Sequence, residues 1–246
     1  MTWISYAQNF EDVILRRALG HVNEGVYIDV GAQHPRIDSV SRSFYEAGWR
    51  GIHVEPVPHY AKLLQEDRPD ERVLACALGS EVGEVNFFQI DGTGLSTASE
   101  AIAMEHAKRD FAIAKISVPQ KNLNFVFDLI KNSDVHWLKI DVEGAEEAVL
   151  RGWKRHSARP WVVVVESTKP LSEEPSFAMW EPLLRARGYR MVYFDGLNRF
   201  YLHKTHLELL PAFSHGPCVF DDFSLSGLAC APFCQHILSL NTKHSG

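Results

Sequence analysis

Four acidic residues follow one short apolar segment of the chain. Residues 137–140 read "WLKI", and the acids that come next are Asp141, Glu143, Glu146 and Glu147. Carboxylates accept protons and bind cations, and they are also favoured at helix N-termini. We predict that Glu146 and Glu147 belong to the first turns of a helix, where the dipole and solvent account for them. Asp141 and Glu143 then lie at a strand end, where either could accept a proton.

Two further residues could assist this chemistry. His34 is a second candidate proton acceptor, and a polar loop residue packed near a ligand is an equally open interpretation. Lys139 stands between two apolar residues and should point to the opposite face of its strand. A pair with Asp141 or Glu166 would explain Lys139 structurally, and a catalytic role is equally open.

Metal sites are weaker hypotheses. Asp141, Glu166 and Asp195 could converge on a divalent cation, which prefers oxygen ligands, but the favoured prediction is that no metal is required. Cys230, Cys234 and His236 have the spacing of half a zinc site, and the other half is missing. The four cysteines are also too few for a disulfide framework, which favours reduced thiols.

Glu55 ends a second apolar segment, "GIHVEP", and lies a little over twenty residues after Gly31. An acid at this offset suits the two hydroxyls of a ribose; the alternative is a surface acid before a proline turn. The loop "DVGAQHP" has one glycine where a dinucleotide motif has three, and Gln33, His34 and Pro35 would obstruct a pyrophosphate. A nucleoside without phosphates, such as S-adenosylmethionine, fits better than NAD.

These residues can act together only if strands and helices bring them to one edge of a sheet. Apolar strands are predicted over residues 26–30, 51–56, 72–79, 135–140 and 161–166, with helices between them, and a turn at Asp195-Gly196 joins two more strands. Residues 84–90 read as one arm of a hairpin. This alternation predicts a doubly wound α/β sheet that is mostly parallel, with ligands at the carboxyl ends of the strands.

Several boundaries and exclusions follow from the rest of the chain. The N-terminal segment "MTWISYAQNFEDVILRRALG" is predicted to be an amphipathic helix, and its Glu11 and Asp12 argue against a signal peptide. A second helix should begin after Asp38 or Ser39 and end at Gly48.

The net charge of −6 over 246 residues, without a basic block, argues against nucleic acid as a binding partner. No apolar run is long enough for a membrane span, so a cytoplasmic protein is expected.

One domain is predicted over residues 1–206, with residues 207–246 as a C-terminal extension that is not an independent domain.

Five segments of the chain together resemble the FkbM family of S-adenosylmethionine-dependent methyltransferases. They are "YIDVGAQHPRIDSVSRSFYEAGWRGIHVEPVP", "WLKIDVEGAEEAVLRG", "SYAQNFEDVILRRAL", "GLSTAS" and "YFDGLNRFYL". The resemblance implies a class I methyltransferase (Rossmann-like) fold, with a seven-stranded sheet whose last strand is antiparallel. It also implies O-methylation, often of sugar hydroxyls.

The resemblance also assigns roles to residues. It places Asp29, Gly31 and Gln33 at the methionine part of the cofactor, Glu55 at the ribose, and Ala77 and Leu78 near the adenine. It places Asp141, Glu143 and Lys139 by the methyl group. Ala32, Ser39 and Pro56 complete the predicted cofactor-binding set. Many relatives have a second glycine near Pro35 and an Asn where Gln33 stands, so this chain departs from the family in that loop.

The sequence therefore predicts an S-adenosylmethionine-dependent O-methyltransferase acting on a sugar, glycan or other hydroxyl acceptor. "GLSTAS" and "DGLNRFYLH" are the candidate walls for that acceptor. Two alternatives stay open: an NAD-dependent oxidoreductase on a similar sheet, and a catalytically silent cofactor-binding module that partners a glycosyltransferase. The sequence does not predict an oligomeric state.

Overall fold

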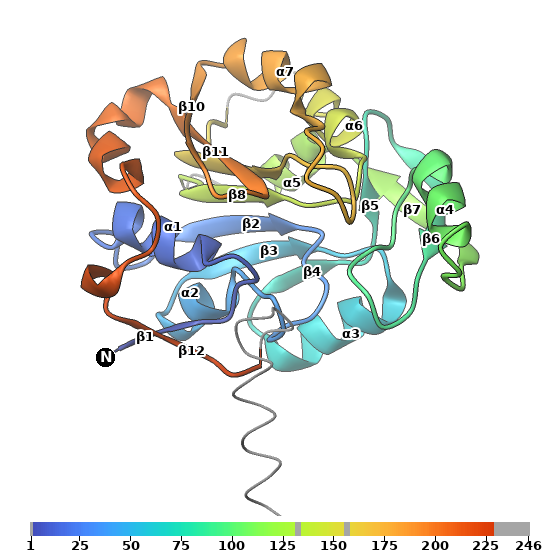
Figure 1. The fold of residues 1–246 in the computed structure, drawn as a ribbon, viewed down its shortest axis with the longest axis horizontal. Helices are drawn as coiled ribbons and strands as arrows, with labels where there is room; N and C mark the ends of the chain where they lie inside the picture. Colours follow the sequence, from blue (N-terminus) through green and yellow to red (C-terminus); the bar gives the residue numbers. More distant parts are fainter. Residues whose placement is uncertain (1, 131–133, 155–157, 229–246) are drawn as a thin grey trace, which may run out of the picture.

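The computed structural model describes residues 2–130, 134–154 and 158–228 (Figure 1). Cys230, Cys234 and His236, the hypothetical half of a zinc site, lie outside the described residues.

A seven-stranded sheet forms the centre of the molecule (Figure 1). Its strands are, in spatial order, β10 (Tyr189–Phe194), β11 (Asn198–His203), β9 (Val162–Glu166), β8 (Trp137–Ile140), β2 (Val26–Val30), β3 (Arg50–Val54) and β4 (Arg72–Leu74). All neighbours from β9 to β4 pair in parallel, whereas β11 is antiparallel to both β9 and β10. The predicted doubly wound sheet with an antiparallel last strand is confirmed. The strand order reverses between β2 and β8, which is where such folds bind ligands.

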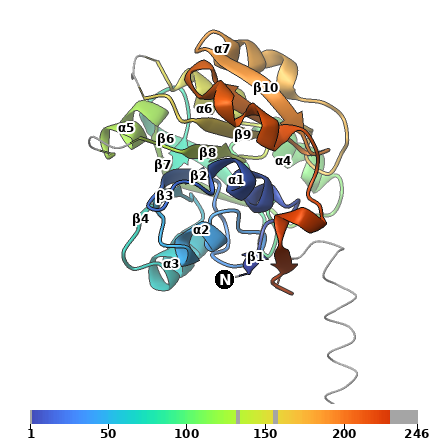
Figure 2. The ribbon, with the colours of Figure 1, turned by 90° about the vertical axis from the view of Figure 1, so that its left-hand side faces the viewer.

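Helices cover both faces of this sheet (Figure 2). One face packs against α5 (Leu123–Asp128), α6 (Glu146–Arg151) and α7 (Glu181–Arg185), which follows the short 3-10 helix η1 (Phe177–Met179). The other face packs against α1 (Glu11–Leu19), α2 (Arg42–Glu46) and the 3-10 helix η2 (Lys204–Phe213). Because side chains alternate along a strand, Val163 and Val165 enter the first core while Val162 and Val164 enter the second. This double burial explains the uninterrupted run of valines over Val162–Val165.

A small second sheet lies beside the large one. It consists of β5 (Ala77–Leu78), β7 (Ala114–Lys121) and β6 (Gly83–Gln89), and near it lie α3 (Pro58–Asp67) and α4 (Glu100–Ala107). The predicted hairpin arm is confirmed as β6, which pairs with β7. The predicted single strand over 72–79 is wrong: the Cys76 N–H donates to the Leu74 carbonyl at 2.9 Å, and this tight turn sends Ala77 to Gln120 of the second sheet.

The N-terminal segment is helical only from Glu11 onward. Residues 3–5 form strand β1 (Trp3–Ser5), which pairs in parallel with β12 (Phe223–Leu225) near the other end of the described chain. The prediction of a helix from the first residue is therefore wrong. Its physical cause is Asp12, whose carboxylate accepts hydrogen bonds from Ser5 Oγ at 2.7 Å and from the Tyr6 N–H at 3.0 Å and so holds the preceding chain away from the helix axis.

The segment after His203 packs along α1. It comprises η2, the short 3-10 helix η3 (Val219–Asp221) and β12. Arg17 of α1 forms an ion pair with Asp221 at 2.7 Å and donates to the carbonyls of Ala212 and Gly216. Across the described ranges, no helix combines the length and the apolar character that crossing a bilayer requires.

Helix α2 begins later than predicted. It starts at Arg42, with Ser41 as N-cap residue, rather than after Asp38 or Ser39, and Ser41 makes no side-chain cap hydrogen bond. The reason is that the hydroxyls of Ser39 and Ser41 already contact the guanidinium of Arg68. The predicted end at Gly48 fits, because this residue has a φ of 93°, which glycine adopts readily.

Candidate active site

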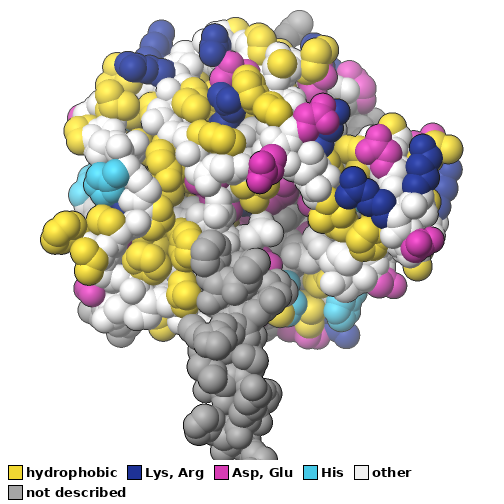
Figure 3. Space-filling view, viewed as in Figure 1, with side chains coloured by type: hydrophobic (Ala, Val, Ile, Leu, Met, Phe, Trp, Pro, Cys, Tyr) yellow, Lys and Arg dark blue, Asp and Glu magenta, His cyan; other side chains and the backbone are white. Residues whose placement is uncertain are grey.

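A cavity of about 570 Å³ opens at the carboxyl ends of the central strands, beside the second sheet. Figure 3 shows acidic side chains in a hollow near the middle of the face seen in Figure 1. Most of the predicted site residues line the cavity: Gly31, Ala32, Gln33, His34, Glu55, Pro56, Ala77, Leu78, Lys139, Asp141 and Glu143. Three residues named from the sequence, Asp29, Ser39 and Asp195, are not part of its wall. The volume suits a nucleoside-sized ligand.

Gly31 lets the two central strands end in contact. Its φ is 79°, and a Cβ atom placed there would lie 1.7 Å from the carbonyl oxygen of Asp141. Its N–H donates to the Val54 carbonyl at 2.9 Å. Any side chain at this position would therefore push β8 away from β2. The lone glycine of the loop has a packing role at the floor of the cavity.

Glu55 organises the part of the cavity wall where β2 and β3 end. Its Oε2 accepts the N–H of Gln33 at 2.8 Å and its Oε1 accepts the N–H of Val57 at 2.7 Å. Burial raises the pKa of Glu55 to about 7, although both hydrogen bonds oppose that change. Gln33 has a φ of 48° and donates through Nε2 to the Thr93 carbonyl at 2.8 Å. Each carboxylate oxygen keeps lone-pair capacity for a ligand hydroxyl.

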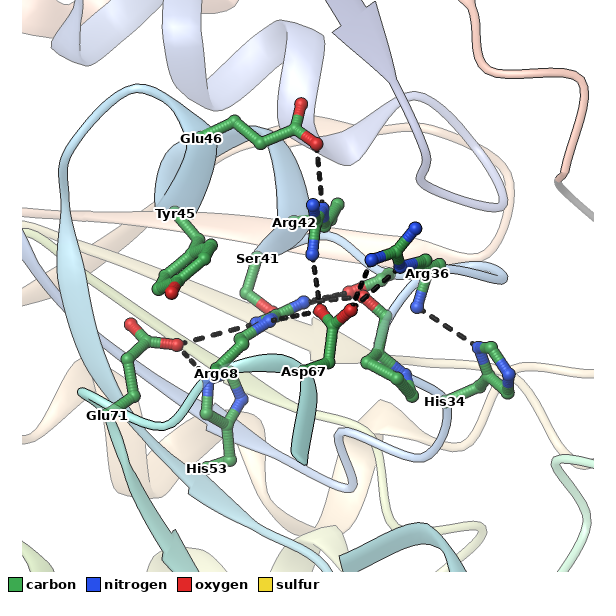
Figure 4. A network of polar contacts seen from close by, with 12 residues as sticks. His34, Arg36, Ser41, Arg42, Tyr45, Glu46, His53, Asp67, Arg68 and Glu71 are labelled. Carbon is green, nitrogen blue, oxygen red and sulfur yellow. Dashed lines mark hydrogen bonds and ion pairs between the residues drawn. The ribbon is translucent and has the colours of Figure 1, made fainter. Parts of the chain in front are cut away.

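Asp29 and Ser39 belong to a buried polar network next to the loop after β2, and Figure 4 labels two other members of it, Arg68 and Ser41. The fully buried Arg68 donates to Ser39 Oγ at 3.0 Å, to Ser41 Oγ at 2.8 Å and to the Pro35 carbonyl at 2.6 Å. Ser41 in turn donates to Asp29 Oδ2 at 2.7 Å. The network fixes residues 35–41, which continue the loop after β2. Asp29 and Ser39 therefore contact the network that positions the loop, and the direct cofactor contact predicted for them stays a prediction.

His34 faces the cavity with a fixed tautomer. Its Nδ1 accepts the N–H groups of Arg36 and Ile37, both at 3.0 Å, so the ring proton resides on Nε2. Partial burial lowers the pKa of this imidazole and favours its neutral form. A neutral ring held in this way presents a hydrogen-bond donor to the cavity. The role of His34 as a proton acceptor stays a prediction.

Three carboxylates converge beside Lys139. One oxygen from each of Asp141, Glu143 and Glu166 lies within 4.8 Å of the others. Burial raises the pKa of Glu143 and of Glu166 well above the usual range, and the charge of Asp141 adds to the effect on both. Glu143 has a φ of 52°, which turns the chain immediately after β8.

Lys139 supplies the opposite charge. Its ammonium forms an ion pair with Asp141, as one of the two sequence interpretations expects. Burial lowers the pKa of Lys139, but the charge of Asp141, followed by those of Glu11 and Asp29, outweighs this effect and keeps the pKa above its usual value. Asp195 does not join the cluster, because its Oδ1 accepts the N–H groups of Leu197 and Asn198 at 2.8 and 2.6 Å.

Glu11 is a wall residue that the sequence analysis missed. Its side chain is buried, accepts Asn198 Nδ2 at 2.8 Å and the Asn9 N–H at 2.9 Å, and lies close enough to Lys139 to interact electrostatically. Burial, with the charge of Asp195, raises its pKa to about 8. The available signal was a pair of acids opening an amphipathic helix, but nothing in the sequence indicated that this helix end meets β8.

The acids of α6 differ from each other. Glu147 pairs with Arg151 one turn later at 2.7 Å, as a helix surface allows. Glu146 is buried, and its Oε1 accepts the Gly144 N–H at 3.0 Å. Burial raises its pKa to about 7. Both occupy the first turn as predicted, but solvent does not account for Glu146; backbone N–H groups do.

Only one of the two predicted acceptor walls lines the cavity well. From "GLSTAS" the wall takes Gly94, Leu95, Ser96 and Ala98. From "DGLNRFYLH" it takes Leu197 alone. Arg199 instead lies over the ring of Phe177, 3.3 Å from its centroid, and Phe200 and Tyr201 are buried in the two cores. Strand β11 is an interior strand, which explains its aromatic residues.

The strand order, the reversed last strand and a nucleoside-sized cavity at the switch point define a class I methyltransferase fold. Residues 29–191, well over half of the chain, match the family model described as "Methyltransferase FkbM domain". The chain therefore belongs to the FkbM methyltransferase family, and S-adenosylmethionine is its methyl donor.

Other comparisons add distant likenesses. No curated protein matches the sequence. A TehB-like SAM-dependent methyltransferase from Corynebacterium glutamicum is 10% identical, with a TM-score of 0.43 over 78% of this chain and 88% of that one. An O-methyltransferase from Bacillus cereus, solved in complex with SAH, is also 10% identical, with a TM-score of 0.41 over 78% of this chain and 80% of that one.

Proposed function

We propose that this methyltransferase transfers the methyl group to a hydroxyl oxygen of a sugar, glycan or glycoconjugate. The observation that carries the proposal is the position of Asp141 and Glu143 in the wall of the cavity that also holds Glu55 and Gly31. Carboxylates beside a methyl donor suit an acceptor that must lose a proton, as a hydroxyl must.

The cofactor's placement is part of the proposal. Glu55 would accept the ribose hydroxyls, Ala77 and Leu78 would contact the adenine, and Gly31, Ala32 and Gln33 would border the methionine part. Support comes from the wall itself, because the apolar residues of the second sheet lie next to the end of β3, and the loop after β2 is tied to Glu55 by a hydrogen bond of 2.8 Å. An adenine needs apolar walls and a ribose needs acceptors.

The reaction is a displacement at carbon. A lone pair of the acceptor oxygen attacks the methyl carbon as the carbon–sulfur bond breaks, and that bond's electron pair stays on sulfur, which leaves neutral S-adenosylhomocysteine. The hydroxyl proton passes to the carboxylate of Asp141 or Glu143. Holding the acceptor in line with the sulfonium supplies a large part of the rate. The Glu143 Oε2 atom, buried and without a hydrogen-bond partner among the described residues, is available for that proton.

The charge of the wall supports an uncharged acceptor. Among the described residues that line the cavity, Lys139 is the only Lys or Arg, and it is paired with Asp141. An anionic acceptor would find no free cation there. Polar uncharged groups complete the wall: Gln8, Thr93, Ser96, Thr168 and Ser172. Such groups hydrogen-bond the multiple hydroxyls of a sugar well.

The test has two stages. S-adenosylhomocysteine should raise the melting temperature of the protein and NAD should not, because only a bound ligand stabilises the fold. Labelled methyl groups should then pass from S-adenosylmethionine to surface polysaccharide of the source organism. Asp141→Asn and Glu143→Gln should each lower that transfer at least tenfold while cofactor binding persists, and Glu174→Gln, an exposed acid paired with Lys169, should leave it unchanged.

Three results would contradict this proposal or its parts. Stabilisation by NAD alone would favour the oxidoreductase alternative. Binding of S-adenosylhomocysteine without methyl transfer to any glycan would favour the silent-module alternative. Full transfer in both amide variants would remove Asp141 and Glu143 as proton acceptors. The cytoplasmic location stays a prediction of the sequence.

A further inference from the structure

We infer that Asp141, Glu143 and Glu166 form a binding site for one hard divalent cation, Mg²⁺ or Mn²⁺. The inference deepens the proposed function and rests on it only for what the cation does to the acceptor. It also replaces the sequence hypothesis that grouped Asp195 with Asp141 and Glu166, because Glu143 takes the place of Asp195.

The spacing of the oxygens suits such an ion. One oxygen from each carboxylate lies within 4.8 Å of the other two. Octahedral coordination at about 2.0–2.1 Å places ligand oxygens about 3 to 4 Å apart. A small inward movement of flexible glutamate side chains closes the difference. The three residues come from two neighbouring strand ends, because Asp141 and Glu143 follow β8 whereas Glu166 ends β9.

Two buried polar atoms provide an independent reason. Glu166 is 7% exposed, and its Oε2 has no hydrogen-bond partner among the described residues. Thr168, which is 6% exposed and also lines the cavity, has an equally unpartnered Oγ1. Buried polar groups in folded proteins are almost always satisfied, and leaving one without a partner costs about 1–3 kcal/mol. Oxygen atoms without partners beside the same cavity are what a ligand with several coordination positions would satisfy.

The charge balance points to a divalent ion. Metal ligation requires the carboxylates in their ionised form, and three ionised carboxylates against the one ammonium of Lys139 carry a formal charge of −2. Glu11 and Glu55 add further acids to the same wall. S-adenosylmethionine brings one sulfonium, one ammonium and one carboxylate, a net charge of +1, and so cannot balance this excess. A divalent cation neutralises the cluster.

The cation would bear directly on the acceptor. With three protein ligands it retains open coordination positions, and a hydroxyl oxygen of the acceptor is a suitable hard ligand. A coordinated hydroxyl has a lowered pKa and a fixed direction. The methyl group and the proton then move as in the proposed mechanism, since each carboxylate has a second oxygen.

The test measures metal binding without cofactor or acceptor. The full chain, stripped with EDTA and freed of chelator, is titrated with Mn²⁺ by calorimetry and by the loss of the free-ion signal in electron paramagnetic resonance. We expect one equivalent to bind, and Glu166→Gln and Asp141→Asn to weaken binding at least tenfold. Glu174→Gln removes the same charge from an exposed position and should bind as the unaltered protein does. If Glu166→Gln unfolds, Glu143→Gln at its less buried position gives the same comparison.

The outcomes separate this inference from the proposed function. No binding of Mn²⁺ or Mg²⁺ at millimolar concentration would overturn the metal site, and so would binding that both variants retain. Methyl transfer that survives chelation, in a protein that binds no Mn²⁺, would overturn it and leave the proposed function intact. Variant-sensitive binding of one equivalent in a protein that methylates no glycan would support the metal site and remove the proposed acceptor.

Discussion

The Oε2 atom of Glu55 accepts the backbone N–H of Gln33 at 2.8 Å, so the first residue after β3 holds the loop that follows β2. Its other oxygen holds the Val57 N–H at 2.7 Å. One buried carboxylate therefore sets the backbone on both sides of the predicted ribose site. If Glu55 binds the ribose as proposed, cofactor binding and loop geometry depend on the same side chain.

Glu55→Gln should weaken the binding of S-adenosylhomocysteine about 10- to 100-fold. An amide nitrogen cannot accept a hydrogen bond, so either the Gln33 or the Val57 N–H loses its acceptor, and a hydrogen bond to a charged group contributes about 1.5–3 kcal/mol. Isothermal titration calorimetry measures the change. Glu84→Gln, at an exposed position of β6, should bind normally. An unchanged dissociation constant for Glu55→Gln would show that the ribose lies elsewhere.

The sequence predicts best where burial is two-sided or alternates regularly. The strands at 26–30 and 162–166 were predictable because Val162–Val165 of β9 all pack into a core, and β2 is apolar apart from Asp29. The strand over 72–79 was mispredicted because it divides between two sheets, and β1 because it pairs with residues some 220 positions away. The local sequence pattern carries no information about pairing partners that lie so far away in the chain or in another sheet.

The residues of the candidate site likewise divide into those that could be placed from the sequence and those that could not. Residues at the strand ends, such as Glu55 and Asp141, could be placed at the cavity from topology alone. Asp29 could not, because its side chain points to the face where Arg68, far along the chain, gathers Ser39 and Ser41. Glu11 was missed for the same reason, since its nearness to Lys139 arises only from helix packing.

Gly31→Ala should destabilise the protein by several kcal/mol more than Gly48→Ala. Both glycines have positive φ, 79° and 93°, so each alanine bears a backbone cost of about 1 kcal/mol. At Gly48 a Cβ meets nothing within 4 Å, whereas at Gly31 it would overlap the Asp141 carbonyl oxygen. Urea denaturation gives the free energy of unfolding of both variants, and the difference between them is the cost of disturbing the contact between β2 and β8. Equal destabilisation would mean that the strand ends separate without cost.

The contribution of three buried acids to the stability of the protein should fall as pH rises from about 5 to about 8. Burial raises the pKa of Glu11 to about 8, and those of Glu55 and Glu146 to about 7, above the ordinary value of 4.5. Between these values the folded state binds more protons than the unfolded state, so stability decreases with pH, by at most about 1.4 kcal/mol per pH unit for each proton.

Glu11→Gln should make this decline shallower, because an amide at position 11 does not have to ionise in a buried place. Denaturation midpoints at pH 5, 6, 7 and 8 provide the comparison. Glu66→Gln, an exposed acid of α3, should leave the slope unaltered. A slope that Glu11→Gln does not change would mean that Glu11 is ionised throughout the range.

Lys139→Met should destabilise the protein by about 3–5 kcal/mol at pH 8. The substitution keeps the volume of the side chain and removes the ammonium that compensates Asp141, with Glu11 and Asp29 nearby, and uncompensated buried charge is costly. At pH 5 the loss of stability should be smaller, since protonation neutralises the acids of the wall whose pKa is raised and removes part of the repulsion.

Lys154→Met, which breaks an exposed pair with Glu81, should cost less than about 1 kcal/mol at either pH. Chemical denaturation at both pH values tests the pair of variants, and a pH-independent loss at position 139 would show that Lys139 acts through packing alone.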